Sequence, residues 1–136
     1  MGGLRPTPSI LRAYCLSTYT AGSITVRIGR PPRGMCSRHA DIVMLSACNP
    51  GGRRKADGWN ERMMWQLRRD LAGAESCEGE GRLGRVAEPL IAVRMPLARA
   101  LRLAARYRQN AVVLLRGTQK ARLLFLPGCE PISGSG

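Results

Sequence analysis

Residues 41–72 limit the possible folds more than any other stretch, because they combine a buried strand, a tight turn and an amphipathic helix. Residues 42–47 are apolar except for Ser46, which is typical of a strand inside a sheet. The sequence NPGG at 49–52 ends that strand, since proline and glycine favour turns. From Asp57, the expected N-cap, apolar side chains recur every three or four residues and predict one buried helical face. A helix packed beside its own strand predicts a mixed α/β architecture.

Other parts of the chain add strand and helix signals of the same kind. The segment 86–94 contains Pro89, so we expect an edge strand or a bulge there. The last two apolar segments are expected to pair as a hairpin across residues 116–120. The predicted strands are 23–29, 42–47, 86–94, 111–115 and 122–126, and the predicted helices run from Asp57 to a stop at Gly73 and over 96–108.

Two segments are less informative. Residues 11–19 fit either a short helix or an extended segment, and no period decides between them. Residues 75–84 are rich in glycine and glutamate, which is typical of a surface loop.

The pattern predicts an α+β protein with a two-layer sandwich architecture. About five strands are expected in a mixed or antiparallel sheet, with two helices on one face. We expect a disordered lead-in over 1–10, a single domain over 11–127 and a flexible tail over 128–136.

The charge is unusual, with 22 Lys and Arg against 9 Asp and Glu and a net charge of +13. Such a balance favours an anionic partner, nucleic acid or a nucleotide. A codon bias towards arginine explains the same excess without any function. No apolar run reaches the length of a membrane helix, and the five scattered cysteines fit reduced thiols in a cytoplasmic protein.

A candidate anion site lies in the turn before the first strong helix. The backbone amides of Gly51 and Gly52 and the charges of Arg53, Arg54 and Lys55 are placed to bind a phosphate. The alternative is an ordinary connection with solvated cations.

A second basic feature lies on the later predicted helix. Arg99, Arg102 and Arg106 follow each other at helical spacing, so the three guanidinium groups share one face. A polyanion would relieve their mutual repulsion, whereas the simpler interpretation is a solvated outer face.

Several short motifs follow one another along the chain: Ala13-Tyr14, Thr18-Tyr19, Arg27-Ile28-Gly29, Ser46-Ala47-Cys48-Asn49-Pro50, Asn60, Glu88-Pro89 and Gln109-Asn110-Ala111. Together they resemble one bacterial family, the domain of unknown function family 3293. That family has an ITAWNP-like strand end, a helical asparagine, an EP pair and a GQNA-like segment, and the resemblance covers about residues 11–126. The chain departs from the family pattern at Cys48, where tryptophan is usual, and at Arg108, where glycine is usual.

The resemblance implies a set of polar positions: Asn49, Asn60, Glu88, Gln109 and Asn110. These side chains are expected either to satisfy buried backbone groups or to line a ligand pocket. In the second case Glu88 is a weak candidate for a catalytic acid or base.

Two further patterns do not support a site. Residues 79–84 match GxGxxG as a string, but no predicted strand precedes them and no predicted helix follows. Cys36 and His39 have the spacing of half a zinc site, and the other half is missing. We therefore expect no metal and no cofactor.

These observations favour a non-enzymatic module that binds an anionic partner through the basic turn and the arginine-lined helix. The alternatives are an enzyme of unknown class with an Asn/Glu pocket, or a protein–protein interaction module.

Overall fold

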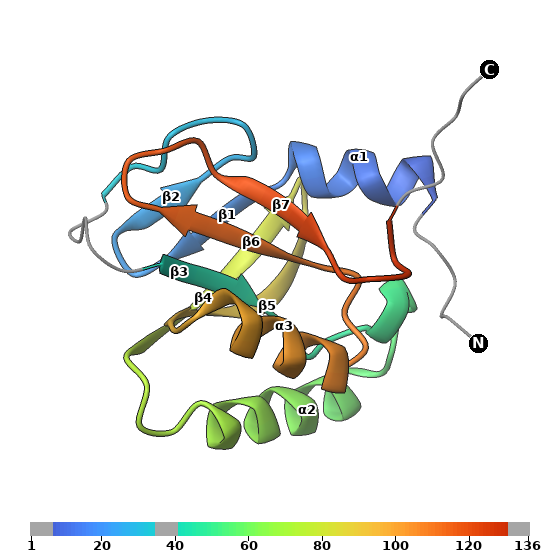
Figure 1. Ribbon diagram of the computed structural model, residues 1–136. Coiled ribbons are helices and arrows are strands. Elements are labelled where there is room, and N and C mark those ends of the chain that lie inside the picture. Colours follow the sequence, from blue (N-terminus) through green and yellow to red (C-terminus); the bar gives the residue numbers. More distant parts are fainter. Residues whose placement is uncertain (1–6, 35–40, 131–136) are drawn as a thin grey trace.

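A computed structural model describes residues 7–34 and 41–130, and these residues form one curled antiparallel sheet with three α-helices (Figure 1). The sheet has seven strands in the order β2-β1-β4-β5-β3-β6-β7. The elements are α1 (Pro8–Leu16), β1 (Thr18–Ala21), β2 (Ile24–Val26), β3 (Asp41–Leu45), the short 3₁₀ turn η1 (Pro50–Gly52), α2 (Asp57–Asp70), β4 (Ser76–Leu83), β5 (Val86–Arg94), α3 (Leu97–Arg106), β6 (Ala111–Arg116) and β7 (Arg122–Phe125).

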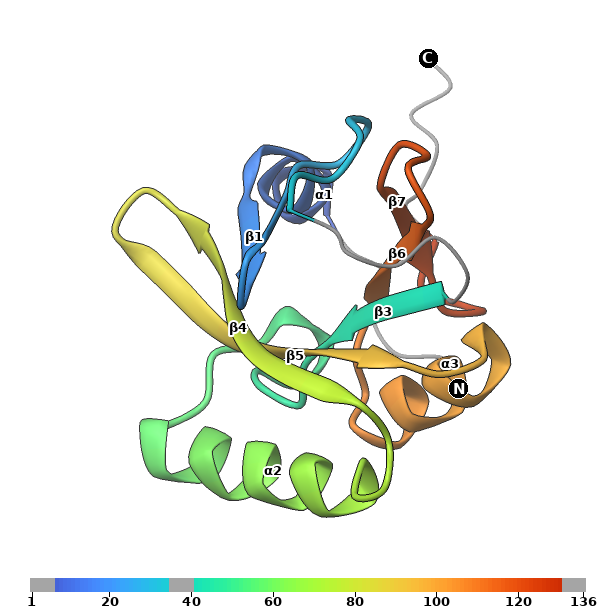
Figure 2. The same cartoon turned by 90° about the vertical axis from the view of Figure 1, so that its left-hand side faces the viewer.

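Helices α2 and α3 cover one face of the sheet, while α1 lies within the curl of the opposite face (Figure 2). The α2/α3 side holds the larger core. There Met64 and Leu67 of α2 and Ala100 and Ala104 of α3 are buried against alternate residues of the central strands, among them Val43. The α+β class and the antiparallel sheet agree with the prediction, whereas the described residues form three helices and seven strands in place of the expected two helices and about five strands.

The second face is covered less completely. A separate cluster of buried side chains includes Tyr19, Met44, Leu90 and Val113. Helix α1 contributes no fully buried residue to it. A loosely covered concave sheet face leaves room between the helix and the strands.

The strand count and the edges of the domain differ from expectation. Residues 76–83 form β4, a central strand, where a surface loop was predicted. Residues 11–19 contain both the end of α1 and the start of β1, so each of the two readings holds for part of the segment. Helix α1 begins at Pro8, inside the predicted lead-in. Residues 1–6 of the lead-in and 131–136 of the predicted tail lie outside the described residues.

The glycines of β4 explain why its sequence does not look like a strand. A Cβ on Gly79 would lie 1.9 Å from the backbone oxygen of Thr20, so strand β1 crosses too closely for any side chain. A Cβ on Gly81 would lie 3.2 Å from the ring of Tyr19. The GxGxxG-like string therefore reflects close strand packing and, at Gly84 (φ 61°), a hairpin turn.

Pro89 lies in a strand that is central rather than at the edge of the sheet. Its segment of β5 nevertheless has a neighbour on one side only, because the pairing of β5 with β3 ends at Ile91. The missing N–H of proline thus removes no bond to β3. The predicted β6–β7 hairpin is confirmed, with Val112 opposite Leu124.

Arg108 adopts a left-handed conformation (φ 54°) directly after α3, where its carbonyl oxygen accepts a hydrogen bond from Gly51 N–H (2.7 Å). The family resembled by this sequence usually has glycine there, and the left-handed backbone explains that preference.

We expect Arg108→Gly to raise the free energy of unfolding by about 1 kcal/mol, because glycine adopts this conformation without steric strain. Arg102→Gly, in the regular part of α3, is the control and should lower it by about 1 kcal/mol. Urea unfolding at neutral pH measures both. Destabilisation by Arg108→Gly would contradict the explanation.

Candidate functional site

A cavity of about 410 Å³ lies between α1 and the concave face of the sheet. Its walls come from α1 and from β1, β3, β4, β5, β6 and β7, and most of the lining is apolar. The polar side chains that line it include Asn49, Glu88, Gln109 and Asn110. Four of the five predicted polar positions therefore border one cavity.

The fifth position, Asn60 on α2, holds Asn49 in place. Asn49 N–H donates to Asn60 Oδ1 (3.0 Å), and Asn60 Nδ2 donates to Asn49 Oδ1 (2.9 Å). The same Asn49 oxygen accepts from the backbone N–H of Lys55 (2.9 Å). Asn60 Oδ1 and Asn49 Oδ1 each accept from a backbone N–H, which fixes the orientation of both side-chain amides. Asn49 Nδ2 consequently donates to Glu88 Oε1 (3.0 Å). Asn60 of α2 thus reaches back to the residue that follows β3.

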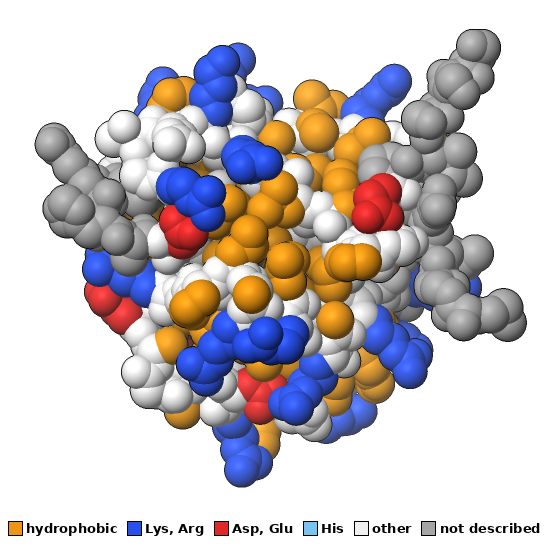
Figure 3. Space-filling model, viewed as in Figure 1, with side chains coloured by type: hydrophobic (Ala, Val, Ile, Leu, Met, Phe, Trp, Pro, Cys, Tyr) orange, Lys and Arg blue, Asp and Glu red, His pale blue; other side chains and the backbone are white. Residues whose placement is uncertain are grey.

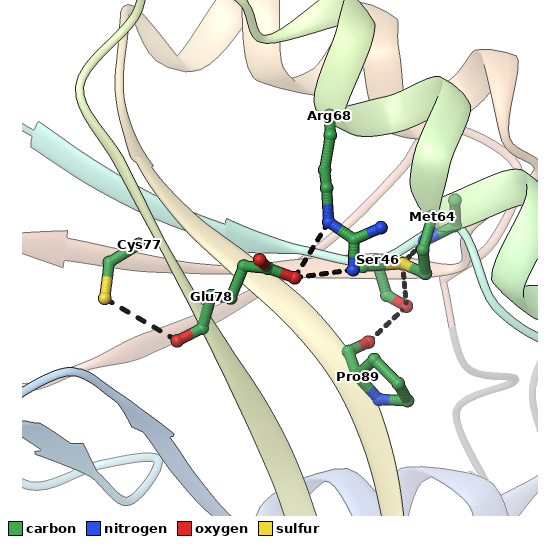
Figure 4. Close-up of polar contacts among 7 residues, drawn as sticks. Ser46, Met64, Arg68, Cys77, Glu78 and Pro89 are labelled. Carbon is green, nitrogen blue, oxygen red and sulfur yellow. Dashed lines mark hydrogen bonds and ion pairs between the residues drawn. The ribbon is translucent and has the colours of Figure 1, made fainter.

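The segment between β3 and Asn49 is fixed by Ser46 (Figure 4). Ser46 Oγ donates to the carbonyl oxygen of Pro89 (2.7 Å) and accepts from Cys48 N–H (3.1 Å). Ser46 Oγ also contacts the sulfur of Met64 on α2 at 3.7 Å. These contacts tie the end of β3 to β5 and therefore bring Asn49 beside Glu88.

Gln109 and Asn110 follow α3 and complete the polar end of the cavity. Gln109 Nε2 donates to the carbonyl oxygens of Cys48 (2.9 Å) and Tyr107 (3.2 Å). Asn110 is buried, and its Nδ2 donates to the hydroxyl of Tyr14 on α1 (3.3 Å). The amides thus have structural partners within the chain, and they also border the cavity.

Burial raises the pKa of Glu88, and the hydrogen bond from Asn49 opposes that rise only in part. The pKa of Tyr14 is also raised, chiefly by burial. A carboxyl group whose pKa is raised by burial in a cavity is a common feature of functional sites.

We expect Glu88→Gln to stabilise the fold in a pH-dependent way. The folded state holds the Glu88 proton to higher pH than the unfolded state, so wild-type stability falls as pH rises from the ordinary glutamate pKa through the raised one. Glutamine does not ionise, so the stability of the variant does not fall in this way, and the glutamine oxygen still accepts from Asn49. Urea unfolding should show equal stability of both proteins at low pH and a more stable variant at pH 8. Glu61→Gln, at an exposed position of α2, should show no such divergence.

The predicted anion turn has exposed cations but not the expected amides. Gly51 N–H donates to Arg108 O, and Gly52 N–H donates to Asn49 O (2.9 Å). The glycine amides are therefore occupied within the chain, which corrects the predicted phosphate cradle. Arg53, Arg54 and Lys55 are exposed, and Lys55 Nζ lies 5.2 Å from the centre of the Trp59 ring. Asp57 is the first residue of α2, whereas the N-cap is Ala56 without a side-chain bond.

The arginine row is exposed on α3, as its spacing predicts. Arg106 is partly neutralised by Asp70 (3.3 Å), and no carboxylate of the described residues pairs with Arg99 or Arg102. Figure 3 shows Lys and Arg side chains gathered over α3 and below it. Away from this face, pairs such as Arg68–Glu78 balance the charge (Figure 4).

The structure adds little to the remaining site predictions. Cys36 and His39 lie outside the described residues. Among the residues that are described, no group of three or more His, Cys, Asp or Glu side chains is arranged to hold a metal, and Cys15, Cys48, Cys77 and Cys129 are free. No helix in the described part of the chain has both the length and the apolar character needed to cross a membrane.

Sequence reasoning missed the contribution of α1. Ile10, Ala13, Tyr14 and Ser17 line the cavity, but no helical period identified their segment. The signal that was present is the Ala13-Tyr14 pair of the family resemblance, which marks Tyr14 without giving its role.

A family profile described as "Protein of unknown function (DUF3293)" matches residues 45–112, half of the 136-residue chain. The match includes Asn49, Asn60, Glu88, Gln109 and Asn110. No curated protein and no solved structure matches the chain. The chain therefore belongs to the DUF3293 family of proteins of unknown function.

Proposed function

We propose that this protein binds a small molecule in the cavity beneath α1, with Glu88 as the group that recognises it. The observation that carries the proposal is the placement of Glu88. Its carboxyl group lies at the polar end of a largely apolar cavity and is oriented by Asn49, which Asn60 and the Lys55 amide hold in turn.

The cavity has the size and composition of a small-ligand site. Such pockets typically have volumes of roughly 300–1,000 Å³ and combine an apolar wall with a few convergent polar groups. Here the volume is about 410 Å³, at the lower end of that range. A small amphipathic molecule therefore fits this space better than a large cofactor.

Binding is better supported than catalysis. Acid–base chemistry commonly uses two groups with different proton affinities. Among the described residues that line the cavity, Glu88 carries the sole carboxyl group and there is no cysteine or lysine to act as a nucleophile. The other polar side chains of the lining are amides and the hydroxyls of Tyr14, Tyr19, Ser17 and Ser46, which suit recognition.

A blocked variant tests the proposal. Small-molecule fragments of mixed charge are screened by two-dimensional NMR, with Ala13→Phe filling the cavity from α1 and Ala98→Phe, on the exposed side of α3, as control. We expect fragments that bind to perturb the signals of Asn49 and Asn110 in the wild type and in the control. The same fragments should bind Ala13→Phe at least tenfold more weakly. Hits that bind Ala13→Phe unchanged, or the lack of any hit at the cavity, would refute it.

Binding of an anionic partner on the outer surface is the second candidate. The predicted basic turn lies next to the C-terminal end of α3, because Gly51 N–H bonds to Arg108 O. Arg53 and Arg54 thus adjoin the helix that carries the exposed Arg99 and Arg102. Neighbouring exposed cations on two segments suit the phosphates of a nucleic acid.

We expect short DNA or RNA to bind at low salt and to weaken steeply as salt increases. Fluorescence anisotropy should show a shallower salt dependence for a double Arg99→Gln, Arg102→Gln variant. Arg12→Gln, an exposed arginine on α1, is the matched control. A lack of binding at low salt, or equal loss in the control, would exclude this interface.

A further inference from the structure

Resting on the proposed small-molecule site, we infer that its ligand is an organic cation: a primary amine with an aliphatic body. The amine would place its ammonium group against Glu88 and its carbon chain along the apolar wall. The charge of the lining, its hydrogen-bonding capacity and its apolar surface each support this class.

The cavity is electrostatically opposite to the rest of the molecule. The chain has 22 Lys and Arg and a net charge of +13, yet no described cation lines the cavity. Glu88 is the one carboxyl group among the described lining residues. A ligand phosphate or carboxylate would be buried beside Glu88 without a counter-charge, which is strongly unfavourable. An anionic ligand is therefore excluded from this space, even in a basic protein.

At the polar end two side-chain oxygens remain as unpaired acceptors, and the Tyr14 hydroxyl, which accepts from Asn110 Nδ2, still has its own O–H to donate. Glu88 Oε1 accepts from Asn49, and its second oxygen has no partner among the described residues. Gln109 must point its Nε2 at the carbonyl oxygens of Cys48 and Tyr107, since carbonyls only accept. Its Oε1 consequently remains as a second unpaired acceptor.

Neither acceptor is sealed inside the protein. In the described residues no fully buried side-chain oxygen or nitrogen lacks a hydrogen-bond partner, so the free oxygens of Glu88 and Gln109 are accessible. An ammonium group supplies three N–H donors, whereas a hydroxyl supplies one. Charged donors also form stronger hydrogen bonds to a carboxylate than neutral ones. The polar end therefore suits an ammonium group best.

The rest of the cavity suits a hydrocarbon chain. Leu90, Val113 and Leu123 line it from three strands, and Leu83 and Val86 lie on the β4–β5 hairpin. The last two are also exposed, at 40% and 72% of their surface. An aliphatic ligand covering them would remove exposed apolar surface from water, which is favourable.

Three probes that share an aliphatic chain but differ in the head group test this inference. They are n-hexylamine, 1-hexanol and sodium hexanoate, each titrated separately into the full-length protein at pH 7.5. NMR shifts locate each probe and give its affinity. We expect n-hexylamine to bind in the cavity at least tenfold more tightly than 1-hexanol, and hexanoate to bind weakest.

Glu88→Gln separates the charge from the shape of the site. The variant keeps an acceptor for Asn49 but has no negative charge, so n-hexylamine should lose roughly tenfold or more in affinity while 1-hexanol changes less than about threefold. Glu61→Gln removes the same charge from the exposed side of α2 and should leave both affinities unchanged.

The pH profile gives an independent readout. Glu88 must be ionised to pair with an ammonium group, and the other ionisable side chains around it, Tyr14, Tyr19 and Cys48, have pKa values raised away from the neutral range. Amine affinity should therefore increase as pH rises through the titration of Glu88, and in Glu88→Gln this dependence should disappear.

The outcomes distinguish the two proposals. If 1-hexanol or hexanoate binds in the cavity as tightly as n-hexylamine, the amine inference is wrong and the small-molecule site stands. If amine affinity is insensitive to Glu88→Gln, the inference is wrong as well. If none of the three probes, and no fragment of the screen, perturbs the cavity, both proposals fail.

Discussion

Asn49→Ala is expected to lower the free energy of unfolding by about 3 kcal/mol, as the sum of a strained backbone and three lost hydrogen bonds. Asn49 adopts a left-handed conformation (φ 47°), which asparagine tolerates and alanine resists. Its side chain bonds to Glu88, Asn60 and the Lys55 amide. Urea unfolding measures the loss, and NMR should show that the 49–60 segment is the part that changes.

Asn49→Gly divides this effect into its two causes. Glycine accepts the left-handed backbone but makes no side-chain bond, so it should be more stable than the alanine variant by about 1 kcal/mol and still weaker than the wild type. Equal stability of the glycine and alanine variants would show that the backbone is unstrained. A loss below about 1 kcal/mol for alanine would show that the network contributes little.

Gly79→Ala is expected to destabilise the fold by about 3 kcal/mol, because the added methyl group overlaps backbone atoms and the strands must separate. The new Cβ would lie 1.9 Å from Thr20 O and 2.8 Å from Ala21 Cα, both on β1. Backbone atoms cannot move aside as a flexible side chain does. Thermal and urea unfolding should both show the loss, and the β1–β4 amide signals should shift.

Gly58→Ala provides the matched control. The same methyl group added there, near the start of α2, meets no atom within 4 Å. It should raise the free energy of unfolding by roughly 0.5 kcal/mol, because alanine favours helix. If Gly79→Ala were as well tolerated, strands β1 and β4 would not approach as closely as the structure has them.

The sequence predicted the helical layer well because its signal is periodic burial. Met64 and Leu67 of α2 recur at helical spacing, and both are buried against the sheet. The same holds for Ala100 and Ala104 of α3. An apolar stripe along one side of a segment predicts both that the segment is a helix and which face is buried. The two helices and the strand beside them were therefore predictable from the local sequence pattern.

Strand β4 was not predicted, and helix α1 was predicted only as one of two alternatives, for physical reasons. Gly79 and Gly81 are required by the close approach of β1, a tertiary constraint that looks like a loop signal in a single sequence. Helix α1 buries no residue completely and so has no apolar stripe to reveal it. Its ends are instead set locally, with Thr7 as N-cap for Ile10 N–H (3.2 Å).

The polar part of the site was predictable and the cavity was not. Asn49 and Asn60 bracket a short turn, so their approach follows from local geometry, and the family resemblance added Glu88. The open space depends on the curl of the sheet and on α1, which join distant segments. The ring of Tyr14 meets that of Phe125 edge-on at 6.2 Å, a contact between the first helix and the last strand.

That contact closes the cavity with two segments that are far apart in the sequence. The residues matched by the family profile, 45–112, include Asn49, Asn60 and Glu88, whereas α1 and β7 lie outside the match. The volume of the cavity therefore depends on how both ends of the described chain dock, and a change that loosens α1 or β7 would widen the cavity while the hydrogen bonds among Asn49, Asn60 and Glu88 stay in place.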